Sequence, residues 1–362
     1  MKKVTIALTV YNKAPWLDRT FNALMNQTYK NIEILVVDNA STDDSPVIIK
    51  KYAEMDNRIR VIRIDKNIGP SNGFATGYRN ATGYYVGSID ADDIIELNYV
   101  EALYHAIDDE KADMAMCVND RIWDDGFSDH KPWPKDNKNV VDGEAAKYLP
   151  LQLLDELNTK YFGFNFPELG VEWGKLYRKD LLREYNLEYD KDLWIWCDHV
   201  FNLEVVKHVK KIVYIKDTTY HFYQDNESVT RLKGYSTRLM DHSEAALIKM
   251  YEASKDLELE GLEAALNVFR YRLLWNAYYY AITYWPGTVK FKDILGVLER
   301  MSAHQEIKKL YNSTELYLLD DQKRHYLRMF KEKKHIYALS LYLNARRITA
   351  NILRKIGIKK TR

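Results

Sequence analysis

Cysteine is scarce in this sequence: its 362 residues include only two, Cys117 and Cys197. They lie far apart and lack the spacing of a metal site, which excludes a disulfide framework and indicates a reducing compartment. No run of about 18 apolar residues is present, so we expect no membrane-spanning helix. The apolar run at residues 4–10 is too short for the core of a signal peptide. We therefore expect a cytoplasmic protein, or one that is peripheral at the inner face of the cell membrane.

An excess of charge of one sign is also missing. The 53 Lys and Arg residues nearly balance the 52 Asp and Glu residues, for a net charge of +1. The chain as a whole is therefore not built to bind nucleic acid. It has no Gly-Lys-Ser/Thr loop, and no G-x-G-x-x-G follows its first apolar run. These absences exclude a P-loop nucleotidase and a dinucleotide-dependent dehydrogenase.

The first hundred residues alternate between two hydrophobic patterns. Residues 4–10 and 32–38 are continuous β-branched runs, typical of parallel strands that are buried on both faces. Residues 59–65 alternate, which predicts a strand with one exposed side. Helical patterns lie between them, at residues 15–27 and 43–55. Strands and helices in this order predict βαβ units, and hence an open α/β sheet.

Polar clusters follow three of the predicted strands, at residues 9–12, 38–44 and 90–93. Because ligands of open α/β sheets bind beyond the carboxyl ends of the strands, we expect all three clusters to line one crevice. The third cluster holds Asp90, Asp92 and Asp93, whose like charges repel unless they are solvated or share a cation. Aspartate oxygens on a sharp turn suit Mg²⁺ or Mn²⁺, which can bridge two phosphates. Asp93 is expected to cap the helix that follows.

These features together resemble a known family. The segments VTIALTVYNKAPWLDRTFNALMNQTYKNIEILVVDNASTDDS, NIGPSNG and YYVGSIDADD are similar to the N-terminal half of glycosyltransferase family 2, over about residues 3–100. A looser similarity continues to about residue 230 through WGKLYRKDLL, WCDHVFNLEVV and YHFYQDNESVT. The resemblance implies a GT-A fold, in which an open and mostly parallel sheet is flanked by helices. It also implies an inverting enzyme that uses a nucleotide sugar and Mn²⁺ or Mg²⁺.

Carried over by position, the resemblance implies a role for each matching residue. Asp92 would ligate the metal directly, with Asp90 beside it, and His221 is a further candidate ligand. Asp198 would be the catalytic base that deprotonates the acceptor hydroxyl. The nucleotide sugar would be bound by Thr9, Val10, Tyr11, Asn12, Asp38, Asn67, Gly69, Asp90 and Ala91. Gly69 and Gly73 are expected to allow tight backbone turns near the nucleotide.

The sequence also departs from the family pattern. Asn39 replaces the usual second acid after Asp38, and Cys197 replaces the usual Glu before the base. Phe74 and Ala75 stand where an Arg-Asn pair is common, and Gln224 replaces a frequent Arg. Contacts to the diphosphate are therefore expected from Lys175, Arg178 or Arg231. Trp173 is a candidate platform for the acceptor sugar, although core packing explains this ring equally well. A lone histidine such as His221 is more often structural than a ligand.

The chain is expected to divide near residue 232. Residues 1–232 would form the GT-A domain, with a nucleotide-binding half (1–105) and an acceptor-binding half (106–232), and residues 233–362 a helical region. Residues 331–362 carry ten Lys and Arg residues against a single acid, Glu332. This tail predicts a basic amphipathic helix, which would either lie on an anionic membrane or pack its apolar face on the protein.

The sequence thus favours an inverting transfer of sugar from a nucleoside diphosphate sugar, with UDP the family's common choice. The acceptor would be a hydroxyl of a glycan or lipid-linked glycan in surface polysaccharide biosynthesis. Two alternatives stay open: a catalytically impaired protein that binds nucleotide sugars, and a sugar-1-phosphate nucleotidyltransferase. The second would need a Gly-rich basic loop after the first strand, where this chain has TVYNKAPW. The oligomeric state is left open.

Overall fold

The computed structural model describes most of the first 283 residues. The described residues are 1–123, 128–130, 136–156, 160–164, 166, 168–224, 237–283 and the single positions 292, 295, 296, 299, 303, 308, 338, 341 and 345. They belong to two compact units, Met1–Asp225 with Lys249–Leu257, and Asn226–Ile248 with Glu258–Arg362. The expected boundary after residue 232, Arg231, and all but three positions of the tail at 331–362 lie outside the described residues.

The first unit contains a sheet of ten strands in the order β3-β2-β1-β4-β9-β6-β10-β5, with β7 paired to β6 and β8 to β10. The strands are β1 (Val4–Val10), β2 (Ile32–Asn39), β3 (Ile59–Ile64), β4 (Tyr85–Asp90), β5 (Ile94–Ile95), β6 (Met114–Trp123), β7 (Ser128–His130), β8 (Lys138–Asp142), β9 (Lys175–Arg178) and β10 (Lys211–Gln224).

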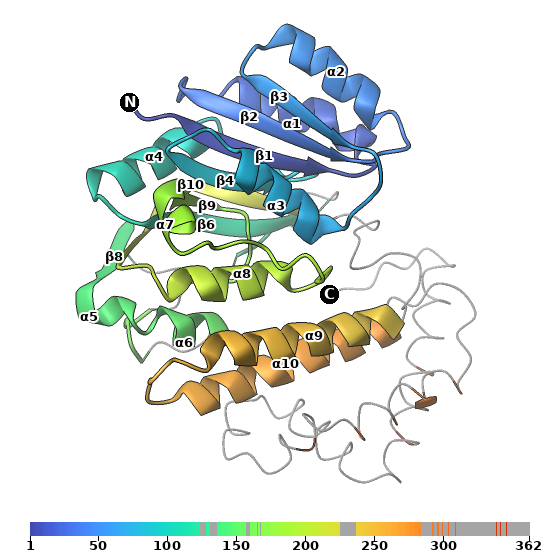
Figure 1. The fold of residues 1–362 in the computed structure, drawn as a ribbon, viewed down its shortest axis with the longest axis vertical. Helices are drawn as coiled ribbons and strands as arrows, with labels where there is room; N and C mark the ends of the chain where they lie inside the picture. Colours follow the sequence, from blue (N-terminus) through green and yellow to red (C-terminus); the bar gives the residue numbers. More distant parts are fainter. Residues whose placement is uncertain are drawn as a thin grey trace. The chain divides into compact units, whose positions relative to one another are not determined.

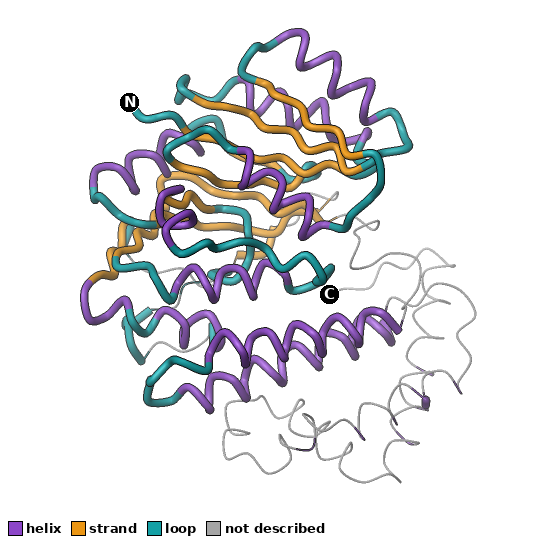
Figure 2. The backbone as a smooth tube through the Cα atoms, viewed as in Figure 1, coloured by secondary structure: helices purple, strands orange, loops and turns teal. Residues whose placement is uncertain are grey.

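Helices flank this sheet on both faces (Figure 2). Those of the first unit are α1 (Ala14–Met25), α2 (Ser45–Met55), α3 (Pro70–Asn80), α4 (Tyr99–Asp109), α5 (Gly143–Ala146), α6 (Leu149–Leu154), α7 (Lys179–Glu184) and α8 (Cys197–Val206). Two longer helices follow, α9 (Thr237–Ser254) and α10 (Leu262–Thr283). Among the described residues, no helix combines the length and the apolar character that crossing a membrane requires.

The first three predicted strands form where the hydrophobic pattern placed them. All eight residues of β2 are buried, as expected for a strand covered on both faces. β1 pairs in parallel with β2 and with β4, and β2 pairs in parallel with β3. The second half of the sheet is mixed, because β9 runs antiparallel to both β4 and β6. The predicted α/β class is confirmed, with a sheet that is parallel in its first half and mixed in its second.

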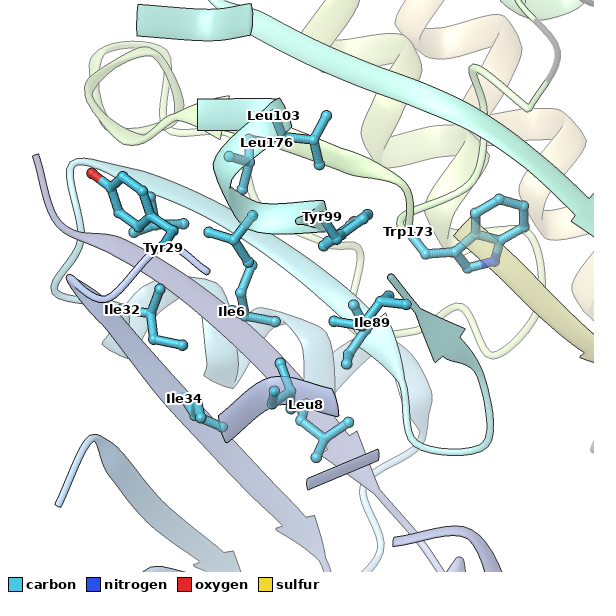
Figure 3. Close-up of a cluster of buried hydrophobic side chains, with 14 of the residues drawn as sticks. Ile6, Leu8, Tyr29, Ile32, Ile34, Ile89, Tyr99, Leu103, Trp173 and Leu176 are labelled. Atoms are coloured by element: carbon cyan, nitrogen blue, oxygen red, sulfur yellow. The ribbon is translucent and has the colours of Figure 1, made fainter. Parts of the chain in front are cut away.

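The side chains of β1 alternate between two helical layers. Ile6 and Leu8 point into the main hydrophobic cluster, which they share with Phe21 of α1 and with Tyr99 of α4 (Figure 3). Ala7 and Thr9, which alternate with them, face α3, and this helix crosses the opposite face of the sheet (Figure 1). Side chains of a strand alternate between its two faces, so a single strand serves both layers. The heavy burial on both sides fixes the register of β1.

Helix α3 comes close to the sheet because its contact face is made of glycine. A Cβ on Gly73 would lie 2.5 Å from Thr9 Cγ2, and a Cβ on Gly77 would lie 3.0 Å from Ala7 Cβ. The sequence analysis did not predict this helix, because residues 66–83 are rich in Gly and Asn, which lower helix propensity. It also assigned Gly73 to a tight turn, and this was wrong. Gly73 lies inside the helix, where its missing side chain allows close packing on the strand.

Gly87 of β4 is expected to be essential for stability. A Cβ at this position would lie 2.2 Å from the carbonyl oxygen of Lys175 in the adjacent strand β9. We predict that Gly87→Ala lowers the free energy of unfolding by about 3 kcal/mol, because the two backbones must separate. Gly143→Ala is the control: nothing lies within 4 Å of its Cβ and its φ is +56°, so backbone strain alone should cost about 1 kcal/mol. Equal losses in denaturant titrations of the two variants would contradict the prediction.

Candidate active site

The polar ends of β1, β2 and β4 lie side by side. Thr9 is opposite Asp90 of β4, and Val10 is opposite Asp38 of β2. From β1 the chain moves outward to β2 and β3, and then returns to the other side of β1 to form β4. The helices that follow β1 and β3 therefore lie on opposite faces of the sheet. This makes the edge at the ends of β1, β2 and β4 the topological switch point, where open α/β sheets bind ligands. The predicted convergence of the three polar clusters at one edge is confirmed.

The loop after β1 is held in an unusual conformation. Asn12 has a φ of 53°, and Ala40 in the neighbouring loop has a φ of 64°. The Asn12 Oδ1 accepts a hydrogen bond from the Thr42 N–H at 2.7 Å, and the Asn12 N–H donates to Ser41 Oγ at 3.0 Å. Left-handed residues that are held in this way concentrate at ligand sites. Tyr11 beside them is 42% exposed, so its ring is accessible at this edge.

Asp38 is buried at the end of β2 with two partners. Its carboxylate forms an ion pair with Arg63 and accepts a hydrogen bond from the Ser41 N–H at 2.9 Å. Arg63 lies opposite Asp38 in the parallel pairing of β2 with β3 and is half exposed. A cation therefore lies beside a residue that was predicted to bind the nucleotide sugar. The sequence analysis missed Arg63, because its role depends on strand register and not on a local motif.

Asn39 connects β2 to the loop before α3. Its Nδ2 donates to the Gly69 carbonyl at 3.0 Å, and its Oδ1 accepts from the Ile68 N–H at 3.1 Å. Asn67 completes this loop by accepting from the Gly69 N–H at 2.8 Å. An amide supplies both a donor and an acceptor, whereas an ionised carboxylate supplies acceptors only. The departure from the family's second acid therefore has a structural consequence: Asn39 fixes the loop that contains two predicted nucleotide-binding residues.

Gly69 begins this loop-to-helix connection with a φ of +83°, a conformation that glycine adopts without strain. A Cβ here would also lie 2.9 Å from the ring of Trp194. Trp194 is 43% exposed and belongs to the segment before α8. That segment is attached to α3, because the side chain of Asn72 donates to the Lys191 carbonyl at 2.9 Å. The sequence analysis missed Trp194, an exposed aromatic ring beside the predicted nucleotide loop.

Three carboxyl groups from three separate segments gather near the end of β4. Asp90 is the last residue of β4, and Asp198 lies in the first turn of α8. Glu172 is buried next to Trp173, which forms a β-bridge with Ser88 of β4. Each of the three acids lies within electrostatic range of the other two. This cluster contains the predicted base and one predicted metal ligand, together with an acid that the sequence analysis missed.

The environment pushes the pKa values of these three groups apart. Burial raises the pKa of Asp90 to about 7, and the nearby charge of Asp92 adds to the effect. Burial, with the charges of Asp90 and Asp198, also raises the pKa of Glu172 well above its usual range. Burial acts in the same direction on Asp198, but the charge and hydrogen bonds of His199 outweigh it, so the Asp198 pKa is lowered. Asp198 is therefore the most acidic of the three groups.

Asp92 lies at the same edge, two residues after Asp90, and two cations contact it. Its carboxylate forms an ion pair with Lys13, the residue that follows the first polar cluster. Its backbone carbonyl accepts a hydrogen bond from Arg19, whose guanidinium also lies 4.6 Å from the centre of the Tyr223 ring. Both cations therefore lie at the carboxyl end of β4, the edge at which open α/β sheets bind ligands. The sequence analysis missed both, since neither belongs to a recognisable motif.

The residues at this edge fit a divalent cation that is shared with a substrate. Asp90 and Asp92 supply carboxylate oxygens, the ligands that Mg²⁺ and Mn²⁺ prefer. Among the described residues, no three His, Cys, Asp or Glu side chains gather into a complete metal site. Mg²⁺ is often held by only one or two carboxylates and takes its other ligands from substrate phosphates and water. The donor set therefore suits a cation that arrives with the nucleotide.

His221 and Asp93 have other partners. The Nδ1 of His221 lies 2.7 Å from Asp120 Oδ1, and its Nε2 lies 3.7 Å from Glu96 Oε1. Its role as a metal ligand stays a prediction. Asp93 was expected to cap α4, and this was wrong, because the residue before that helix is Asn98. The buried carboxylate of Asp93 instead accepts hydrogen bonds from the Tyr220 hydroxyl and the Tyr223 N–H, at 2.5 and 2.8 Å.

Two of the predicted contacts to diphosphate or acceptor are core residues. Trp173 is only 7% exposed and stacks on Tyr220 with ring centres 4.6 Å apart, so it offers no open platform. Lys175 is fully buried, and its ammonium donates to the carbonyls of Glu168, Val171 and Trp173. Burial lowers the Lys175 pKa to about 8. For Trp173 the structure agrees with core packing, the second of its two expected roles, and the expectation for Lys175 was wrong, because its ammonium is used by backbone carbonyls.

Arg178 lies at the wrong end of the sheet to contact a diphosphate. It is opposite Tyr85, the first residue of β4, whereas Asp90 is the last. Five residues of strand, at about 3.3 Å each, separate these ends by about 16 Å. Its guanidinium forms an ion pair with Asp113 at 2.6 Å. The expectation for Arg178 was wrong, and Arg19 and Lys13 are the cations on the correct edge.

Strand-end carboxylates at a topological switch point are typical of α/β proteins that bind a ligand at this edge. The chain belongs to glycosyltransferase family 2: the family model described as "Glycosyl transferase family 2" matches residues 5–183. It is 32% identical over 233 residues to Glycosyltransferase GlyA of Streptococcus pneumoniae, which covers 64% of this chain and 32% of that protein. It is 27% identical to the uncharacterized glycosyltransferase EpsJ of Bacillus subtilis, covering 69% of this chain and 68% of EpsJ. The chain thus spans about a third of GlyA and two thirds of EpsJ.

Solved structures share the fold. The structure of TarS residues 1–349 of S. aureus in complex with UDP-GlcNAc has a TM-score of 0.63 at 18% identity, and covers 95% of this chain and 92% of that one. The mannosyltransferase PcManGT of Pyrobaculum calidifontis, in complex with GDP-Man and Mn²⁺, has a TM-score of 0.51 at 15% identity, with 94% and 87% covered. The predicted GT-A fold is confirmed by this likeness. The roles of individual site residues stay predictions.

The raised pKa of Asp90 predicts a pH-dependent stability. Its folded pKa of about 7 exceeds the ordinary value of 3.8, so between these values the folded state binds more protons than the unfolded state. The metal-free protein should therefore lose about 1–3 kcal/mol of stability as pH rises from 5 to 8. Asp90→Asn should flatten this slope in denaturant titrations at each pH. Identical slopes for wild type and variant would show that Asp90 titrates normally.

Asn39→Asp should be destabilising, although an acid is usual in the family. At pH 7 the new carboxylate would face the Gly69 carbonyl without a proton to donate, a loss of about 1–3 kcal/mol. Stability should partly recover near pH 4, where the carboxyl group can donate again. The control is Asn26→Asp, because the Nδ2 of Asn26 also donates to a carbonyl, that of Asn22 at 2.8 Å, but at an exposed site. Equal melting temperatures for the two variants at pH 7 would contradict the role of Asn39.

Proposed function

We propose that this protein is an inverting glycosyltransferase that moves one sugar from a nucleoside diphosphate sugar to an acceptor hydroxyl. The observation that carries the proposal is the cluster of Asp90, Glu172 and Asp198 at the switch point. Groups whose environments drive their pKa values apart are typical of acid–base chemistry. Here Asp198, whose side chain is 20% exposed, has a lowered pKa beside two acids with raised pKa values, and a general base requires the ionised state that a lowered pKa favours.

In the proposed reaction, Asp198 accepts the proton of the acceptor hydroxyl. The acceptor oxygen forms a bond to the anomeric carbon while the bond from that carbon to the diphosphate oxygen breaks. Because attack and departure occur on opposite faces, one displacement inverts the configuration and needs no covalent enzyme intermediate. A positioned base of this kind contributes about 10²–10⁴-fold to the rate.

Asp92 and Asp90 would hold Mn²⁺ or Mg²⁺ between the protein and the diphosphate. A divalent cation stabilises the negative charge of a departing diphosphate. Lys13 and Arg19 lie at the same edge and would add positive charge on the protein side. Asp38, Asn67 and the loops around Asn12 and Gly69 would bind the nucleoside, with the ring of Tyr11 available to contact the base.

UDP is the favoured nucleotide of the donor. TarS, which shares the fold, has been solved in complex with UDP and with UDP-GlcNAc. The mannosyltransferase with the same fold has been solved in complex with GDP-Man, so a guanine donor belongs in any test. The acceptor would be a hydroxyl of a glycan or of a lipid-linked glycan in surface polysaccharide biosynthesis. Work on such an acceptor would occur in the cytoplasm or at the inner membrane face.

A donor panel tests this function. UDP-, GDP- and dTDP-sugars are offered with Mn²⁺ or with EDTA, and release of the nucleoside diphosphate is measured. We expect turnover of one donor with Mn²⁺ and none with EDTA. Asp92→Ala should abolish that turnover through loss of metal binding, and Asp198→Asn should lower transfer by 10²-fold or more while donor binding persists.

The matched control is Asp109→Asn, which removes an acid with a 66% exposed side chain on α4, away from the crevice. It should retain wild-type turnover. If wild type binds one donor only with metal but releases no product with any acceptor offered, the protein is a nucleotide-sugar-binding protein without transfer. If no donor binds under either condition, the proposed function is wrong.

A further inference from the structure

We propose that a cavity between α3, α7 and α8 is a second binding site, which takes a small organic phosphate with an apolar or aromatic body. The cavity has a volume of about 310 Å³ and is lined by residues of these three helices and of the loop at 186–189. None of these residues is a predicted ligand of the metal or of the nucleotide sugar. The inference therefore goes beyond the proposed function and does not depend on it.

One wall of the cavity is aromatic and rigid. It consists of the rings of Tyr78, Tyr189 and Phe201, which are all buried. Tyr189 stacks on Phe201 with ring centres 4.1 Å apart, and Tyr78 meets both rings edge-on with its centre 5.6 Å from each. The buried side chain of Leu182 adds an aliphatic surface. A wall of this kind suits the apolar or flat part of a ligand.

A buried ammonium lines the same cavity. Lys179 is only 8% exposed, and its Nζ donates a hydrogen bond to the carbonyl of Ala81, the residue that follows α3. The C-terminal end of a helix stabilises such a cation. A lysine ammonium has three donors, however, and the described part of the chain offers this one no further acceptor. Two of its donors are therefore available to a ligand.

A second cation lies one helical turn further along α7. Arg183 lines the cavity, is exposed, and makes no ion pair or side-chain hydrogen bond with any residue that the structure describes. Like charges at this spacing on a helix repel each other. Burial lowers the pKa of Lys179, and the charge of Arg183 lowers it further. A bound anion would relieve this repulsion, and the fork of a guanidinium matches the oxygens of a phosphate group.

The acids nearby do not neutralise these two cations fully. Glu188 lines the cavity, but its carboxylate is engaged with the guanidinium of Arg79, at 2.7 and 3.2 Å. Glu33 is engaged in the same way by Arg60, at 3.0 Å. Asp180 of α7 is exposed and does not line the cavity, although its charge acts on the lysine. Four cations thus face three acids, and the cations of α7 carry the unbalanced charge.

Size and charge together define the class of ligand. Ligand cavities commonly measure about 300–1,000 Å³, so this one is at the small end and fits a single ring or a short chain. A phosphate monoester carries up to two negative charges and three terminal oxygens, which can serve the lysine and the arginine at once. Its organic group would lie against the aromatic wall. A carboxylate has one charge and two oxygens, and satisfies the two cations less well.

Calorimetric titration of the full chain with phenyl phosphate at pH 8 tests the proposal. We expect saturable binding with a Kd below about 1 mM, and binding at least about 10-fold weaker for inorganic phosphate and for benzoate. Arg183→Glu should weaken phenyl phosphate binding by about 10–100-fold. Leu187→Trp, which places a larger side chain at the cavity wall, should also weaken it. Melting temperatures identify any variant that fails to fold.

The matched control is Lys210→Glu, which reverses an exposed positive charge that does not line the cavity. It should keep the wild-type Kd. Absence of saturable binding to wild type would overturn the proposal, as would a wild-type Kd in folded Arg183→Glu and Leu187→Trp. Equal affinity for benzoate would show that the site does not select phosphate. Equal affinity for inorganic phosphate would show that the aromatic wall takes no part.

Two further titrations separate this site from the candidate active site. Asp92→Ala, and wild type saturated with UDP and Mn²⁺, should both bind phenyl phosphate with the wild-type Kd. Loss of binding in either one would place the probe at the switch-point edge and overturn the proposal. If phenyl phosphate binds as expected while no nucleotide sugar is bound or turned over, the proposed function fails and the second site stands.

Discussion

The parallel pairing of β1 with both β2 and β4 is the constraint on which the site depends. It places Thr9 beside Asp90 and Val10 beside Asp38, although these residues are far apart in the sequence. The pairing is fixed by burial of β1 on both faces, with Ile6 and Leu8 in the main cluster and Ala7 under the glycine face of α3. A shift of one residue would exchange these two sets of side chains. The requirements of the core therefore determine which polar groups meet at the crevice.

Charge is distributed unevenly along this crevice. Asp92 is paired with Lys13, while Asp90, Glu172 and Asp198 form an acidic cluster in which Glu172 is buried and the side chain of Asp198 is 20% exposed. A cation that arrives with a substrate could bind Asp92 and Asp90 together. It would balance negative charge that the protein alone leaves unbalanced. The acids of this cluster disfavour one another's ionised state, and the contacts with His199 lower the pKa of Asp198. The same set of acids can thus serve both metal binding and proton transfer.

Much of the first half of this structure could be predicted from the sequence. The β-branched runs at 4–10 and 32–38 are too short to form long helices and are therefore strands. The polar residues after them necessarily lie at strand ends. Helix α3 was missed because its Gly and Asn residues are poor helix formers, and packing of Gly73 against Thr9 stabilises it in the fold. Local propensity cannot report a contact between residues 64 positions apart.

The cations and the second acid of the site could not be predicted for a similar reason. Lys175 and Arg178 are near a family motif, but only the register of β9 shows that one is buried beneath the loop and the other lies at the far end of the sheet. Lys13, Arg63 and Glu172 have no local signal, and each reaches the crevice through strand pairing or loop packing. Position 197 lacks the expected glutamate, and the carboxyl group beside Asp198 comes instead from 26 residues earlier in the chain.

The most direct test of this account is the position of a bound metal. Crystals of the protein grown with Mn²⁺ and UDP, measured at a wavelength where manganese scatters anomalously, locate the ion without reference to any assumed role. The account predicts one strong peak at the Asp92 carboxylate, beside Asp90 and the diphosphate, with the ammonium of Lys13 moved away from Asp92. A peak among His221, Asp120 and Glu96, or bound UDP with no peak near Asp92, would contradict it.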